Sequence, residues 1–168
     1  DCLNTYPLDI PKTKDIKSFD ELYKTYPEFY KLLFRIFNDE ELDKQEVDNR
    51  ITYFMTAICY AIQNPQRLKP KGLLINTQNS AGKTQLMGIF KDCFSELVLT
   101  GKTLNGILSD RFNGYMINKV IVCCEELKPN QDYEVLKEWI DAKTYSIEQK
   151  GKETIDVPNT SIKIFFSN

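Results

Sequence analysis

The feature that most constrains the fold is a short apolar strand that runs through a polar loop into a helix. Residues Gly72 to Ile75 are apolar, the loop from Thr77 to Gly82 follows, and an apolar-periodic stretch begins at Lys83. A strand, a loop ending in Gly-Lys-Thr and a helix, in this order, form the setting of a phosphate-binding loop. The sequence therefore predicts an α/β fold built on a parallel sheet.

In such a loop, backbone N–H groups and the start of the helix face phosphate oxygens. Lys83 is expected to neutralise charge on the β- and γ-phosphates during catalysis, and the Thr84 hydroxyl to hold Mg²⁺. Thr77 stands where the pattern G-x-x-x-x-G-K-[ST] has its first glycine, so the pattern is incomplete. The residues that we expect to bind ATP are Asn79, Ser80, Ala81, Gly82, Lys83, Thr84 and Gln85.

A second Gly-Lys-Thr stands at Gly101, Lys102 and Thr103. It ends a strand-like run, but Glu96 takes the place of the first glycine. The tripeptide is common by chance, and here it lacks the spacing of a phosphate loop. We interpret it as a structural segment.

Two carboxylates follow a second buried strand. The apolar run Val120 to Cys124 leads into Glu125 and Glu126, and a parallel sheet presents ligand-binding residues at this carboxyl edge. We expect Glu125 to hold the hydration shell of Mg²⁺, and Glu126 to polarise the water that attacks the γ-phosphate. A solvated acidic loop is the alternative, and the phosphate loop upstream argues against it.

The last strand, from Ser161 to Phe166, ends in Ser167 and Asn168. Asn168 is placed to orient the attacking water. Before this strand, two alternating segments flank Lys150, Gly151 and Lys152, which is typical of a hairpin with a glycine tip. The alternating segments are 144–149 and 153–157.

The remaining elements follow from apolar periodicity and turn residues. We expect an extended arm over 1–17, a helical region from Ser18 to Phe37 broken at Pro27, and a helix over about 45–63. Two units result, with an arm and helical segment over 1–66 and a phosphate-loop core over 67–168. The core should hold strands at 72–76, 96–100, 119–124 and 161–166, and helices at 83–94, about 104–115 and 133–142.

Composition narrows the class of protein. The 168 residues carry a net charge of −2, so any contact with nucleic acid must be local rather than spread over the surface. Five cysteines with no histidine and no Cys-x-x-Cys spacing argue against a zinc site and favour a reducing compartment. No apolar run has the length of a membrane span, so we expect no membrane partner.

The order of phosphate loop, acidic strand end, hairpin and polar strand end resembles the superfamily 3 helicases over about 72–168. It looks most like the replication-initiator helicases of parvoviruses, which carry a Gln-Lys-x-Lys hairpin similar to the segment from Gln149 to Lys152. The resemblance implies an AAA+-like three-layer phosphate-loop domain with a hairpin before its sensor strand. It makes Asn168 the sensor, and Lys150 and Lys152 the contacts to single-stranded DNA.

The resemblance also implies a viral ATPase and DNA helicase that works as a homo-hexamer in the host nucleus, with ATP and Mg²⁺ as cofactors. The family's arginine finger lies beyond the sensor strand, and none of the four arginines matches it: Arg35, Arg50, Arg67 and Arg111. Because the chain starts at Asp1 without a leader and stops directly after a strand, we expect a fragment of a longer protein. Without the arginine finger, this fragment alone is expected to be a monomer.

Two alternatives to the DNA helicase remain open at this stage. One is an ATPase of a positive-strand RNA virus from the same superfamily. Another is a degenerate ATPase fold kept as an oligomerisation scaffold, which only Thr77 supports. A nucleotide kinase is disfavoured, because an acceptor lid should be rich in arginine.

Overall fold

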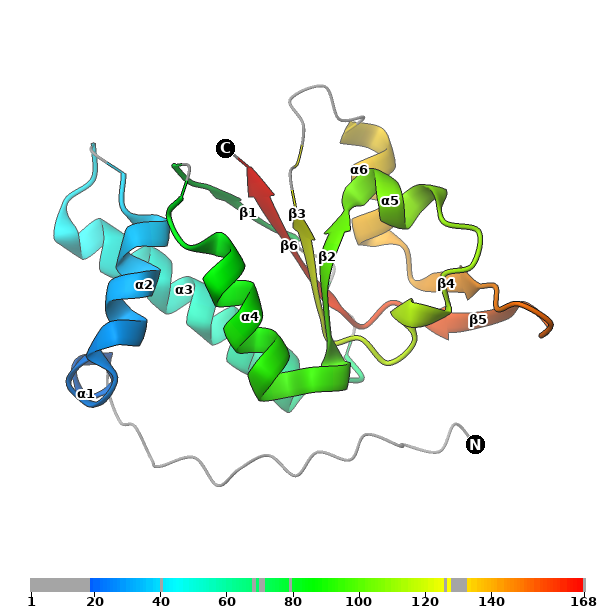
Figure 1. Ribbon diagram of the computed structural model, residues 1–168, viewed down its shortest axis with the longest axis horizontal. Coiled ribbons are helices and arrows are strands. Elements are labelled where there is room, and N and C mark those ends of the chain that lie inside the picture. The colour runs from blue at the N-terminus through cyan, green and yellow to red at the C-terminus, as the bar shows by residue number, and fades with distance from the viewer. Residues whose placement is uncertain are drawn as a thin grey trace.

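The computed structural model describes residues 19–39, 41–67, 69, 72–78, 80–125, 127 and 133–167. Its centre is a parallel sheet with the strand order β1-β6-β3-β2. Helices cover both faces of this sheet (Figure 1), which confirms the predicted α/β class. The strands are β1 (Gly72–Asn76), β2 (Val98–Thr103), β3 (Ile121–Glu125) and β6 (Ile162–Ser167).

One face of the sheet packs against the helices that precede and follow β1. Ile121 and Cys123 of β3 point to this side, together with Ile162, Ile164 and Phe166 of β6. A capping box between Asp43 and Glu46 starts the longest of these helices, and Pro27 begins the second, as the predicted break requires. The helices on this side are α2 (Pro27–Phe37), α3 (Lys44–Gln63) and α4 (Lys83–Phe94), and α1 (Phe19–Thr25) packs against α2.

The other face packs against two shorter helices and a hairpin. Val122 and Cys124 of β3 and Phe165 of β6 point to this side, so each strand alternates between the two layers. The helices are α5 (Leu104–Ser109) and α6 (Tyr133–Asp141), and the hairpin pairs β4 (Thr144–Ile147) with β5 (Ile155–Pro158). The predicted hairpin is therefore confirmed, with shorter strands than expected.

The predicted helix over 104–115 is wrong in its second half. α5 ends at Ser109, a loop follows, and a short 3₁₀ turn covers Gly114–Met116. The dipeptide Asn113-Gly114 is a turn signal that apolar periodicity does not register. The broken helix matters because its loop reaches the hairpin.

The second Gly-Lys-Thr lies inside β2 and has a structural role. β2 begins after a 3₁₀ turn at Ser95–Leu97 and continues to Thr103, later than the predicted 96–100, because a bulge shifts its register between Leu99 and Lys102. Gly101 takes a positive φ of 76° at this bulge, a conformation that glycine adopts without strain. Thr103 then caps α5 by accepting from the N–H of Gly106 at 3.1 Å.

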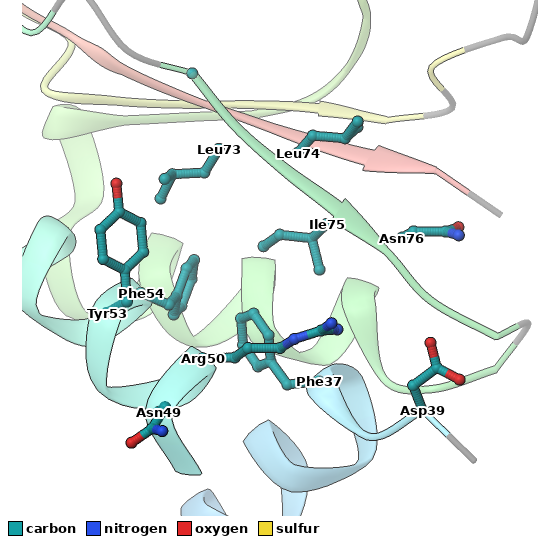
Figure 2. A pocket seen from close by; sticks show the side chains of 11 residues that line it. Phe37, Asp39, Asn49, Arg50, Tyr53, Phe54, Leu73, Leu74, Ile75 and Asn76 are labelled. Carbon is teal, nitrogen blue, oxygen red and sulfur yellow. The ribbon is translucent and has the colours of Figure 1, made fainter. Parts of the chain in front are cut away.

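β1 forms one edge of the sheet, beside a surface groove of about 670 Å³. Figure 2 shows Tyr53 and Phe54 of α3 opposite Leu73 and Ile75 in this groove, with Leu74 turned to the other side of the strand. Leu74 is 59% exposed. In the part of the chain that the structure describes, no helix is both long and apolar enough to cross a membrane.

Candidate functional site

The loop between β1 and α4 has a backbone shaped to surround an anion. Ser80 has a φ of 63° and Gly82 a φ of 105°, so two alternate positions are left-handed. Such alternation turns successive N–H groups toward one side of the chain. Gly82 also has no room for a side chain, because an ideal Cβ would lie 2.5 Å from Leu32 Cδ1 of α2.

The start of α4 adds further donors to this loop. Gly82 is the N-cap residue and offers no side-chain cap, and no acidic residue occupies the first turn. The first bond of the helix runs from the N–H of Leu86 to the carbonyl of Gly82 at 3.0 Å, so the N–H groups of the first turn point out of the helix end. This end therefore has the partial positive charge that a phosphate group neutralises.

Thr77, in place of the usual first glycine, belongs to the sheet rather than to the turn of the loop. Its side chain is buried, its N–H donates to the carbonyl of Ser167 at 3.1 Å, and its φ is not positive. The position therefore needs no glycine in this chain. The left-handed positions fall at Ser80 and Gly82 instead.

Strand order brings the polar strand ends next to the loop. Asn76 at the end of β1 pairs with Ser167 of β6, and the N–H of Leu127 donates to the carbonyl of Phe166 at 3.0 Å. Glu125 closes β3, the strand on the far side of β6, and is half-buried. Glu125 thus lies at the same carboxyl edge of the sheet as the loop between β1 and α4.

The expected nucleotide-binding residues differ in how far they are exposed to solvent. Ala81 is buried, Gly82 and Lys83 are half-buried, and Ser80, Thr84 and Gln85 are exposed at the loop and the start of α4. Asn79, Glu126 and Asn168 lie outside the described residues.

The described residues at this sheet edge offer few ligands to a metal ion. Among the described residues, no group of three or more His, Cys, Asp or Glu side chains could bind a metal ion. The oxygens of Thr84 and Glu125 are of the kind that Mg²⁺ prefers, and this ion usually keeps water and phosphate oxygens as its other ligands. The residues present therefore fit an ion that arrives with a nucleotide.

A second cavity adjoins the loop on the side of β1. It measures about 400 Å³, and its walls are the turn after α2, Arg50 of α3 and residues 76–78. Figure 2 shows the guanidinium group of Arg50 and the carboxylate of Asp39 on the same side of the strand as Ile75. The loop between β1 and α4 thus adjoins an open, mostly polar cavity.

Lys150 and Lys152 lie at the exposed tip of the hairpin. Gly151 between them has a φ of 75°, and the N–H of Lys152 donates to the carbonyl of Gln149 at 3.1 Å to close the turn. Neither lysine forms an ion pair with any residue that the structure describes. The hairpin and α4 lie on opposite sides of the sheet (Figure 1), so the tip is remote from the phosphate loop.

The 110–114 loop, which follows α5, is fastened along the hairpin. The Asn113 side chain donates to the carbonyl of Ser146 at 3.0 Å and accepts from the N–H of Glu148 at 2.9 Å. Arg111 Nε lies 3.0 Å from Glu148 Oε1. The loop is thereby held in one position beside the hairpin.

This loop exposes a cation and an aromatic ring that the sequence analysis left unassigned. Phe112 is 45% exposed, and the guanidinium carbon of Arg111 lies 5.5 Å from its ring centroid. An exposed aromatic ring beside cations is the combination that stacks bases and contacts phosphates of single strands. The predicted helix over 104–115 gave no reason to single out Arg111 and Phe112. The turn signal Asn113-Gly114, which follows them directly, could have indicated a loop.

Comparison with known proteins places the chain in a family and in a fold. A sequence profile described as a family of unknown function (DUF5906) matches residues 74–168. No curated protein sequence matches the chain.

The fold is shared with solved structures of the NrS-1 C-terminal region. An apo structure covers 94% of this chain with a TM-score of 0.71 and 23% identity. An A-form apo structure of the same region covers 94% with a TM-score of 0.67 and 25% identity. The chain spans about a third of those structures, 36% of the first and 34% of the second.

Proposed function

The chain belongs to DUF5906, a family of unknown function, and we propose that it is the ATP-hydrolysing core of a viral replication helicase that moves along single-stranded DNA. The observation that carries the proposal is the loop with left-handed Ser80 and Gly82 at an uncapped helix start, on the same sheet edge as Glu125. This arrangement supports a site for a nucleoside triphosphate with Mg²⁺. The similarity to the NrS-1 structures supports the fold of such a core.

The phosphates of the nucleotide and its Mg²⁺ ion have expected partners. The loop N–H groups and the Lys83 ammonium group bind phosphate oxygens, while Thr84 and Glu125 hold Mg²⁺, directly or through its water. Glu126 as the general base and Asn168 as the sensor stay part of the proposal. Hydrolysis requires that the attacking water lies in line with the γ-phosphate, and we expect Glu126 and Asn168 to hold it there.

DNA binds elsewhere in the proposal, at the hairpin tip and the 110–114 loop. Lys150, Lys152 and Arg111 supply positive charge for phosphates, and Phe112 supplies a ring for stacking. In a homo-hexamer, six such tips would concentrate positive charge in a central channel, although the net charge of one chain is −2. The isolated chain should be a monomer, which light scattering can measure.

The test is nucleotide hydrolysis by a longer, ring-forming protein. Lys83→Ala should abolish hydrolysis, whereas Lys91→Ala, which removes an exposed lysine from the other end of the same helix, should leave it intact. Glu125→Gln should weaken Mg²⁺-dependent nucleotide binding, and Glu126→Gln should slow turnover by roughly 10² or more. Wild-type hydrolysis by Lys83→Ala would refute the assignment of the ATPase site to this loop. No hydrolysis by the wild type would favour a scaffold.

The nucleic acid is tested separately. A DNA helicase requires that single-stranded DNA stimulates hydrolysis and that a duplex with a single-stranded tail is unwound. Stimulation by RNA without an effect of DNA would favour an RNA-virus ATPase.

A further inference from the structure

Arg35 of α2 lies at the phosphate loop although it is far from the loop in sequence. An ideal Cβ on Gly82 would lie 4.0 Å from Arg35 Nη2. The side chain of Arg35 is exposed, so its guanidinium group is accessible to a ligand.

α2 is seated firmly against the loop. Leu32 is 1% exposed, and its Cδ1 occupies the place where a Gly82 side chain would be. Residues three apart lie on the same face of a helix, so the contact of Leu32 carries Arg35 to the same loop. The position of the guanidinium group is therefore a consequence of core packing.

The charge of Arg35 is unmatched within the described part of the chain. The groove beside it, of about 500 Å³, is lined by three cations. Two of them have partners, since Lys31 Nζ lies 2.7 Å from Glu28 and Lys44 Nζ lies 2.7 Å from Asp48. Arg35 forms no ion pair or side-chain hydrogen bond with any described residue.

The surroundings of Arg35 are positive on the side of the loop. The start of α4 carries the partial positive charge of a helix N-terminus, and Lys83 is its first residue. The guanidinium group of Arg35 and these positive groups all favour an anion as their neighbour. The C-terminal turn of α2, where Arg35 resides, relieves only part of the repulsion among them.

We propose that Arg35 binds a phosphate oxygen of the nucleoside triphosphate in the same subunit, as a second cation beside Lys83. This inference rests on the proposed nucleotide site. A guanidinium group can donate two parallel hydrogen bonds to a phosphate, which a lysine cannot do. The helical segment before β1 thereby becomes part of the nucleotide site.

The experiment compares charge reversal at two positions of α2 in the full chain. Arg35→Glu should weaken binding of a fluorescent ATP analogue roughly 10- to 100-fold or more, as loss of a charged hydrogen bond does. Lys31→Glu makes the same change of charge on the same helix and should weaken binding less than about 3-fold, through screened long-range repulsion only. Arg35→Lys should fall between the wild type and Arg35→Glu.

Thermal unfolding separates binding from structure. Without nucleotide, Arg35→Glu should unfold at the wild-type temperature or higher, because its carboxylate replaces a repulsive charge beside α4. With nucleotide, the increase in unfolding temperature seen for the wild type should disappear. A merely structural arginine predicts the opposite, a lower temperature without nucleotide and a retained increase with it.

Two outcomes overturn the inference, and they are distinguishable. If the wild type binds ATP, Lys83→Ala does not, and Arg35→Glu binds like the wild type, the nucleotide site stands and the role of Arg35 is refuted. If the wild type does not bind ATP, the proposed function fails and the inference fails with it.

Discussion

The Asn159 side chain accepts a hydrogen bond from the ammonium group of Lys163 and turns its amide nitrogen to the end of α6. That nitrogen lies 2.7 Å from the carbonyl of Ala142 and 3.3 Å from those of Trp139 and Ile140. Asn159 follows the hairpin, and Lys163 is a fully buried residue of the central strand β6. One amide therefore joins the hairpin, α6 and the sheet.

Asn159→Ala should lower the free energy of unfolding by roughly 2 to 4 kcal/mol, because it leaves a buried ammonium group and several helix-end carbonyls short of partners. Adding Lys163→Met should restore part of this loss, since it removes the buried charge itself. Urea unfolding of the two single variants and the double variant measures the coupling. Additive losses would contradict the direct link between the two side chains.

Stability should rise with pH above neutrality. Burial lowers the pKa of Lys163 to about 7, helped by the nearby charge of Lys69, and burial lowers the pKa of Lys69 to about 8. Both values lie below the ordinary 10.5, so over this range the unfolded chain binds more protons than the folded one. The free energy of unfolding should then increase by up to about 1.4 kcal/mol per pH unit for each proton that differs.

The other titratable groups packed near Lys163 do not reverse this sign below about pH 9. Burial raises the pKa of Cys124 to about 12 and raises that of Tyr145, so they lower the stability only where the unfolded groups ionise, from about pH 9 upward. Unfolding measured from about pH 7 to about pH 9 should show the slope in the wild type and a smaller slope in Lys163→Met. Lys91→Met, which removes the same charge from the surface, is the matched control.

Two glycines of one segment should respond in opposite directions to the same substitution. Gly82→Ala meets both a positive φ of 105° and Leu32 Cδ1 at 2.5 Å, so it should destabilise the chain and displace the loop. Gly88, inside α4, has nothing within 4 Å of an ideal Cβ, and Gly88→Ala should stabilise by about 0.4 to 1 kcal/mol. Thermal unfolding and binding of an ATP analogue measure the two effects.

A salt titration of single-stranded DNA binding should distinguish the contribution of charge at the hairpin from that of stacking. Lys150→Ala with Lys152→Ala should reduce the salt slope of log affinity by about 0.7 for each lost phosphate contact. Phe112→Ala should weaken binding by about 1 to 3 kcal/mol while leaving the slope unchanged. Fluorescence anisotropy measures both, with Lys91→Ala as the control, and unchanged affinity in all variants would refute this DNA surface.

Local patterns predicted β1, the loop after it and α4 well. β1 and α4 have the bounds read from the sequence, because an apolar run, a glycine-containing loop and helical periodicity follow one another without a break. The hairpin was also predicted, since Gly151 separates two alternating segments. These segments could be predicted because neighbouring sequence signals agreed with one another.

Contacts between distant segments could not be predicted in the same way. Nothing near Arg35 in the sequence marks its approach to Gly82, which depends on how α2 packs against α4. Lys163 breaks an apolar run, and its burial depends on Asn159, Trp139 and Tyr145 meeting around it. β2 and α5 end at other residues than predicted. The bulge at Gly101 depends on how β2 pairs with β3, and the loop after Ser109 depends on its contact with the hairpin, and neither shows in the apolar periodicity.

The strand order also has a consequence for biosynthesis. β6 is the last of the described strands to leave the ribosome, yet it separates β1 from β3 and forms hydrogen bonds with both. β2 and β3 can pair as soon as both are made, whereas β1 has no place in the sheet until β6 arrives. Its apolar side chains, Leu73 and Ile75 among them, therefore stay in an incomplete core while the residues between Asn76 and Ile162 are translated. A nascent chain stalled before Ile162 should be open to proteolysis and bound by chaperones, and release of β6 should protect β1 and β3 together.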